Sequence, residues 1–119
     1  MRAANAVNKL PKAESHLELT LRVQLRALGL PEPVLQHRLV PGRRFRADLA
    51  WPAALVYVEC EGGIWVGGRH GTGSGIESDS EKTSLAALEG YRLIRCTRSQ
   101  IESGEAASWI ERALREEAP

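Results

Sequence analysis

Two neighbouring stretches, GRRFRADLAW (residues 42–51) and LVYVECEGG (residues 55–63), decide how this sequence is interpreted. Both alternate apolar and polar residues with a period of two, which is typical of β-strands whose successive side chains point to opposite faces of a sheet. In the first stretch the period predicts a common face for four apolar residues: Phe45, Ala47, Leu49 and Trp51. The opposite face then carries Arg44, Arg46 and Asp48.

The second stretch places acidic side chains beside this polar face. Glu59 and Glu61 are two residues apart, so their carboxylates project from one side of the strand, opposite a face formed by Val56, Val58 and Cys60. If the two strands pair, Asp48 lies across from Glu59 with about 5 Å between their Cβ atoms. Carboxylates this close repel one another unless a cation neutralises them, and hard oxygen ligands suit Mg²⁺ or Mn²⁺.

The sequence therefore predicts a metal site formed by Asp48, Glu59 and Glu61. The alternative is a solvated sheet face on which these acids pair with Arg44 and Arg46. The valines before Glu59 favour the metal site, because a central strand seldom carries free charges.

Outward from these strands, the patterns predict one α/β domain over residues 13–119, preceded by a basic, loosely ordered tail over residues 1–12. Leu17, Leu21, Leu25 and Leu28 recur at helical spacing between residues 13 and 30, and Gly29 and Pro31 end that helix. Three strands follow at residues 34–40, 44–51 and 55–61, joined by connectors short enough for an antiparallel meander.

After the third strand, residues 62–77 form a predicted loop that holds seven of the eleven glycines. Ser78 and Glu81 form a capping-box pattern, which predicts a helix that runs to about residue 89. A buried strand at residues 91–97 follows. Ser103 then caps a final helix, whose common face carries Ala106, Trp109, Ile110 and Ala113. The predicted order is α-β-β-β-α-β-α around a single mixed sheet.

Two further residues are candidates for the chemistry. Glu18 lies at the edge of the first helix's apolar stripe, and its partner is either Arg22 at i+4 or the metal and its water. Lys82 lies one turn into the capped helix; it either supplies a cation to a phosphate or is simply an exposed lysine. Asp79 is interpreted as a first-turn acid that complements the helix dipole. Cys60 and Cys96 are interpreted as buried, small hydrophobic residues on neighbouring strands.

The glycine-rich loop lacks the Gly-Lys-Ser/Thr of a phosphate-binding P-loop, and a mobile lid with Arg69 and His70 at its tip suits it better. Together with the hairpin residues Arg43, Arg44 and Arg46, these two are the candidate DNA contacts.

The net charge of the 119-residue chain is only +1, but this average hides an asymmetry. Residues 1–50 hold nine basic and four acidic residues, whereas residues 51–119 hold seven and eleven. Near-neutrality therefore does not exclude nucleic acid as a partner. Two cysteines, no secretory signal and no apolar run of about 20 residues predict a cytoplasmic protein that does not span a membrane.

The acids on successive elements, Glu18 on a helix and then Asp48 and Glu59-Cys60-Glu61 on two strands, resemble the PD-(D/E)XK nuclease superfamily. The likeness covers about residues 14–115. A closer one, to small phage and bacterial nucleases of the VRR-NUC and very-short-patch-repair-like branch, runs through four segments: LRALGLPEPV (25–34), RRFRADLAWP (43–52), VECEGGIWVGGRH (58–70) and GYRLIRCTRSQI (90–101). Some enzymes of this kind act as archaeal-type Holliday junction resolvases.

The resemblance implies a restriction-endonuclease-like fold and a Mg²⁺-dependent endonuclease in which Asp48 and Glu59 are the central metal ligands, supported by Glu18. The chain departs from the superfamily pattern where its lysine is expected, since Glu61 stands there. Either Lys82 has taken over that role from the following helix, or Glu61 adds a metal ligand. We expect a homodimer acting on branched four-way DNA, because such a junction has two-fold symmetry and needs two cuts. A mismatch-nicking or restriction-type nuclease, and a non-catalytic DNA-binding module, are the alternatives.

Overall fold

A computed structural model describes residues 15–61 and 73–116 as an α/β structure with one four-stranded mixed sheet. The strands lie in sequence order: β1 (Val34–Arg38), β2 (Arg46–Trp51), β3 (Val56–Glu61) and β4 (Arg92–Thr97). The first three form the predicted antiparallel meander, and β4 runs parallel to β3. A parallel neighbour requires a crossover, and helix α3 (Gly73–Leu88) supplies it.

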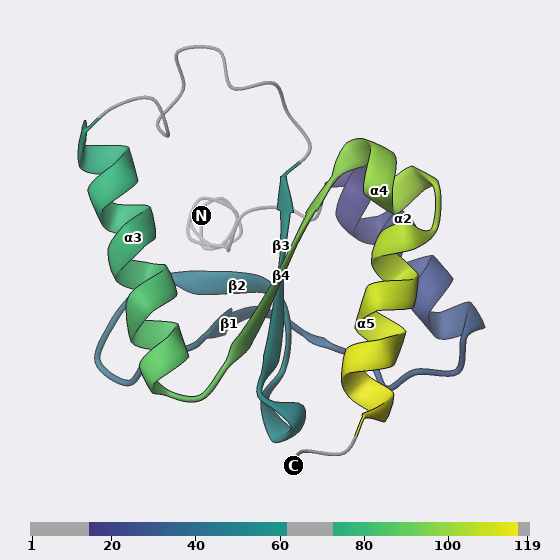
Figure 1. The fold of residues 1–119 in the computed structure, drawn as a ribbon, viewed down its shortest axis with the longest axis horizontal. Coiled ribbons are helices and arrows are strands. Elements are labelled where there is room, and N and C mark those ends of the chain that lie inside the picture. Colours follow the sequence, from purple (N-terminus) through teal and green to yellow (C-terminus); the bar gives the residue numbers. More distant parts are fainter. Residues whose placement is uncertain (1–14, 62–72, 117–119) are drawn as a thin grey trace, which may run out of the picture.

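Helices cover both faces of the sheet (Figure 1). Among the described elements, α3 is the one helix on one of these faces. The other face carries α2 (His16–Ala27), α4 (Arg98–Glu102) and α5 (Glu105–Arg115). The coarse prediction of a mixed sheet flanked by helices is therefore confirmed. None of the helices in the described ranges is long and apolar enough to cross a membrane.

Two apolar clusters correspond to the two faces. The larger cluster joins Leu21 and Leu25 of α2 and Ile110 of α5 to strand residues such as Val58 and Cys96. The predicted common face of the last helix is confirmed, since all four of its residues pack in this cluster: Ala106, Trp109, Ile110 and Ala113. The smaller cluster lies under α3 and centres on Tyr57, which packs with Ala86.

Several element boundaries differ from the predicted ones. Helix α2 ends at Ala27, so Leu28 is partly exposed, while Leu30 turns back into the core. Helix α3 begins at Gly73, so residues 73–77 belong to a helix and not to the predicted loop. A Ser-x-x-Glu pattern marks a possible helix start. It is not needed at Ser78, because the preceding helical residues already offer backbone carbonyls to the N–H groups of the next turn.

The C-terminal region also contains a helix that was not predicted. Thr97 accepts a hydrogen bond from the Gln100 N–H and begins the short helix α4, and Gly104, not Ser103, is the N-cap of α5. Gly104 has φ +87, a left-handed conformation that glycine adopts without the penalty of a Cβ atom. The Thr-x-x-Gln pattern at residues 97–100 is the signal that would have revealed α4.

Candidate active site

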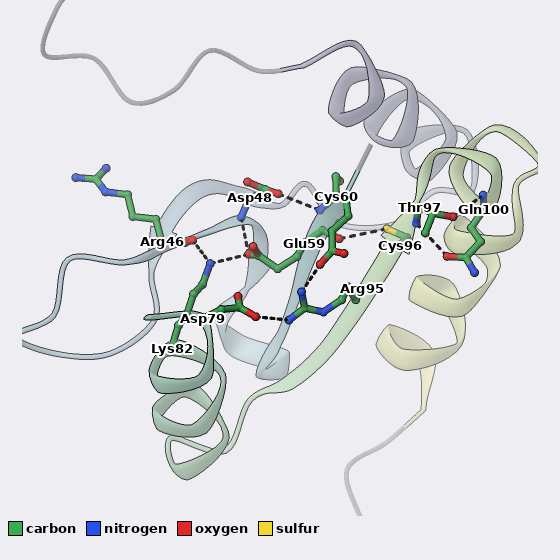
Figure 2. Close-up of polar contacts among 11 residues, drawn as sticks. Arg46, Asp48, Glu59, Cys60, Asp79, Lys82, Arg95, Cys96, Thr97 and Gln100 are labelled. Atoms are coloured by element: carbon green, nitrogen blue, oxygen red, sulfur yellow. Dashed lines mark hydrogen bonds and ion pairs between the residues drawn. The ribbon is translucent and has the colours of Figure 1, made fainter. Parts of the chain in front are cut away.

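The site is built where strands β2 and β3 separate. Their backbone pairing runs from Trp51–Val56 to Leu49–Val58. Beyond that point each strand offers a carboxylate to the backbone of the other. The Cys60 N–H donates to Asp48 Oδ2 at 2.9 Å, and the Asp48 N–H donates to Glu59 Oε2 at 3.3 Å (Figure 2). The predicted meeting of Asp48 and Glu59 is confirmed, and backbone hydrogen bonds fix both carboxylates.

The side-chain alternation of β2 reverses at Asp48. Ala47 packs in the cluster under α3, whereas Leu49 and Trp51 pack in the cluster on the opposite face. Across the β1–β2 pairing lies Gln36, whose φ of 51° is left-handed and costs a non-glycine residue about 1–2 kcal/mol. This distortion of the backbone accompanies the reversal. The predicted common face is therefore wrong for this set: Phe45, Ala47, Leu49 and Trp51.

Lys82 of helix α3 reaches into the site from above the sheet (Figure 2). Its Nζ lies 3.0 Å from Glu59 Oε2 and also donates to the backbone carbonyl of Arg46. The Lys82 side chain is only 14% exposed, so the alternative of a simply exposed lysine is wrong. The crossover helix thus brings a cation onto the carboxylate pair.

The electrostatics of Glu59 follow from its position. Burial raises the pKa of its carboxyl above the usual value, and the neighbouring Asp48 carboxylate raises it further, against the attraction of Lys82. Ionised Glu59 is therefore held at a cost in the metal-free protein. A divalent cation at this place would reduce that cost, since opposite charge favours the ionised form.

Glu61 lies farther along the same strand and is tied to a different cation. Arg95 of β4 forms an ion pair with Glu61 and lies 3.7 Å from Asp79 of α3. Asp79 is not the predicted first-turn acid, because α3 begins six residues earlier. Arg95 was not identified from the sequence. The sequence shows that Arg95 stands between the apolar residues Ile94 and Cys96 of a strand. It does not show the parallel register that places Arg95 beside Glu59.

Glu18 is buried, with 3% of its surface exposed, and it closes the first turn of α2. Its carboxylate accepts a hydrogen bond from the Ser15 N–H at 3.2 Å, and the Ser15 hydroxyl accepts one from the Glu18 N–H at 3.1 Å. This capping box was not among the predicted partners, although Ser-x-x-Glu at residues 15–18 is its sequence signature. Glu18 also acts electrostatically on Cys60 of β3.

The two cysteines are free and lie directly opposite one another in the β3–β4 register. Cys96 is fully buried and Cys60 is half-buried, in line with the prediction of small hydrophobic residues on neighbouring strands. The Cys96 thiol donates to the Glu59 carbonyl at 3.7 Å. Interaction with Cys96 and burial raise the pKa of the Cys60 thiol.

The structure describes three of the five predicted DNA contacts. Arg43 forms an ion pair with Glu81 and lies over the Phe45 ring, 5.8 Å from its centroid, while Arg44 and Arg46 are exposed. The predicted lid residues Arg69 and His70 lie outside the described residues, as does the predicted basic tail.

Whether the site suits a metal ion depends on the two carboxylates of Asp48 and Glu59. Within residues 15–61 and 73–116, no group of three or more His, Cys, Asp and Glu side chains is arranged to hold a metal ion. Magnesium, however, is commonly bound through one or two carboxylates together with water and substrate phosphate. Among the residues that the structure describes, the charged side chains at and next to Glu59 are four acids (Asp48, Glu59, Glu61, Asp79) and two bases (Lys82, Arg95), a formal excess of two negative charges. Asp48 and Glu59 therefore suit one divalent cation.

Comparison of the chain with protein-family models and with curated proteins gives no match in either case.

Proposed function

We propose that this protein is a Mg²⁺-dependent DNA endonuclease of the PD-(D/E)XK type that hydrolyses phosphodiester bonds. The observation that carries the proposal is the placing of Asp48 and Glu59 at the point where two strands separate, with Lys82 of the crossover helix 3.0 Å from Glu59. An exposed pair of acids would pair with surface arginines, not with a lysine that is itself largely buried.

The order of elements supports the same proposal. One helix, three antiparallel strands, a crossover helix and a parallel fourth strand follow one another, an order broadly similar to the restriction-endonuclease-like order that the sequence resemblance implies. The position of the site agrees with it, because the acids lie on the two central strands and the lysine on the crossover helix.

Each residue then has a defined role. Asp48 and Glu59 would hold Mg²⁺ or Mn²⁺, which supplies positive charge to the scissile phosphate and acidity to a water molecule. Lys82 holds Glu59 in place through their ion pair. Its ammonium group would also supply positive charge to the scissile phosphate. The resemblance implies a supporting role for Glu18, whose carboxylate accepts a hydrogen bond from Ser15 in the first turn of α2.

For the substrate, we propose branched four-way DNA cut by a homodimer. The basic first half of the chain, with Arg44 and Arg46 exposed on the β1–β2 side, offers charge to the phosphate backbone. A symmetric junction needs two cuts, and a two-fold dimer supplies two sites.

The test is a gel assay on labelled four-way junction, flap, mismatch and linear duplexes, with Mg²⁺ and with EDTA. We expect Mg²⁺-dependent cleavage that is strongest on the junction, lost in Asp48→Asn and kept in Glu102→Gln. Glu102 is a matched control, because it is an exposed acid paired with Arg98 on α4, away from the site.

Other outcomes would contradict particular parts of the proposal. Equal cutting of all four substrates would overturn the junction preference, and cutting confined to the mismatch would favour a nicking enzyme. Junction binding without cleavage by any Mg²⁺- or Mn²⁺-loaded sample would favour a non-catalytic DNA-binding module. A monomer by analytical ultracentrifugation, with and without junction DNA, would count against the resolvase.

A further inference from the structure

Three charged residues beside the candidate metal ligands form a second cluster, one from each of three elements. Glu61 comes from β3, Arg95 from β4 and Asp79 from α3. Arg95 lies between the two acids, in an ion pair with Glu61 and 3.7 Å from Asp79 (Figure 2 labels Arg95 and Asp79). The cluster thus joins the crossover helix to the two strands that it connects.

Helix α3 changes character along the side that faces the sheet. Near its C-terminal end, Ala86 packs into the apolar cluster with Tyr57, whereas Asp79 and Lys82, closer to the middle of the helix, face the charged side chains of the strands. Toward the N-terminal end, Ile76 is 58% exposed. The polar contacts of Asp79 and Lys82 therefore help to hold this part of the helix over the sheet.

Glu61 is bound to Arg95 in a way that competes with metal binding. The guanidinium is permanently charged and presents paired N–H donors that match a carboxylate. The Glu61 side chain is only 19% exposed, so water screens the pair little compared with a surface ion pair. The guanidinium charge beside Glu61 offsets its negative charge and so weakens its attraction for a cation at the site.

We infer that Arg95 is a positioning residue that withholds Glu61 from the metal site and, through Asp79, holds α3 so that Lys82 reaches Glu59. This inference rests on the proposed nuclease function. On this inference the metal is held by two carboxylates, those of Asp48 and Glu59. Where the chain departs from the superfamily pattern, the inference favours Lys82 in the role of the lysine over Glu61 as an added metal ligand.

The test measures Mn²⁺ binding by electron paramagnetic resonance, in the absence of DNA, on the full chain and six variants. These variants are Asp48→Asn, Glu61→Gln, Arg95→Met, Arg95→Lys, the double variant Arg95→Met/Glu61→Gln, and Arg98→Met. Arg98→Met is the matched control, because Arg98 pairs with Glu102 on an exposed face of α4. Thermal unfolding in EDTA shows that each variant is folded.

We expect Arg95→Met to bind Mn²⁺ about tenfold more tightly, since the freed Glu61 adds a negative charge at the site. The double variant returns to the wild-type dissociation constant, as does Arg95→Lys, because both keep the net charge of the pair. Glu61→Gln alone leaves the guanidinium charge uncompensated and binds Mn²⁺ more weakly than the wild type, but by much less than Asp48→Asn does. Junction cleavage nevertheless falls in Arg95→Met, through kcat, because Lys82 is no longer held over Glu59. A merely structural arginine would lower stability without moving the Mn²⁺ dissociation constant.

Two results would overturn the inference. One is a loss of Mn²⁺ binding in Glu61→Gln as large as that in Asp48→Asn, which would make Glu61 a metal ligand. The other is an unchanged Mn²⁺ dissociation constant in Arg95→Met. Equal Mn²⁺ binding by the wild type and Asp48→Asn is a separate result, which would overturn the proposed function and this inference with it.

Discussion

The two faces of the sheet are covered in different ways. On the side of α2, α4 and α5, apolar side chains from three helices form a cluster that extends from Leu17 to Ile110. On the side of α3, a smaller apolar cluster joins Tyr57 to Ala86 of the helix, whereas Asp79 and Lys82 of the same helix contact charged side chains of the strands. Both faces belong to the same four strands, so the difference comes from which residues point each way.

This contrast separates stability from chemistry. Burial of apolar surface on the α2 side supplies most of the driving force for folding, at about 25 cal/mol per Å². On the α3 side, one end of the face lacks such apolar burial. It carries two carboxylates, a lysine and an arginine in fixed positions instead. Substitutions on the two sides should therefore affect different measurements.

The largest effect on stability is expected on the α2 side. Ile110→Ala removes a fully buried side chain and should lower the free energy of unfolding by about 2–5 kcal/mol, because the cavity left behind cannot fully close. The measurement is urea denaturation followed by circular dichroism. Ile76→Ala is the matched control on α3, where the side chain is 58% exposed, and should change stability by less than about 0.5 kcal/mol. Equal losses would remove the contrast between the faces.

A smaller effect, on activity, is expected on the α3 side. Lys82→Met should lower the rate of Mg²⁺-dependent junction cleavage about 10- to 100-fold, because Glu59 loses the partner that orients it. The rate is measured under single-turnover conditions. Arg112→Met, on the exposed face of α5, should leave it unchanged. Wild-type cleavage by Lys82→Met would show that the α3 side does not contribute to the chemistry.

The smallest effect concerns the cost of holding Glu59 ionised. Because its pKa is raised in the folded state, Glu59 contributes stability at low pH that is lost as pH rises through this pKa. Glutamine stays neutral, so Glu59→Gln should match the wild type below the ordinary glutamate pKa of 4.5 and become the more stable of the two as pH rises through the raised pKa. Urea denaturation in EDTA across this range measures the gap. A gap that does not change with pH would contradict the assigned cause.

The sequence allowed the strands and the carboxylate pair to be predicted, because a period of two and the acids on it are local features. Alternation placed Glu59 opposite Val58, and it correctly indicated that Asp48 and Glu59 meet. It failed at Ala47 and Leu49, because the left-handed backbone of Gln36 and the reversal at Asp48 depend on the pairing of strands and not on local pattern.

The charged contacts on the α3 side could not be predicted for a related reason. The register that places Cys60 beside Cys96 also places Arg95 near Glu61, and this register is set by a crossover helix whose start was misjudged at Ser78. Lys82 was identified because it stands alone among arginines, but its burial follows from the position of α3 over the sheet. The capping boxes at Ser15 and Thr97 do have local sequence signatures, Ser-x-x-Glu and Thr-x-x-Gln, so these two helix starts are predictable from the sequence.

One paired measurement on Asp48→Asn tests the central claim most directly, namely that the α3 side holds a metal-dependent site independent of the fold. Junction cleavage and thermal unfolding are measured with Mg²⁺ and with EDTA. We predict that Mg²⁺ raises the melting temperature of the wild type but not that of the variant, that the two melt alike in EDTA, and that the variant cleaves at least about 1,000-fold more slowly. Full cleavage by Asp48→Asn with Mg²⁺ would contradict the account.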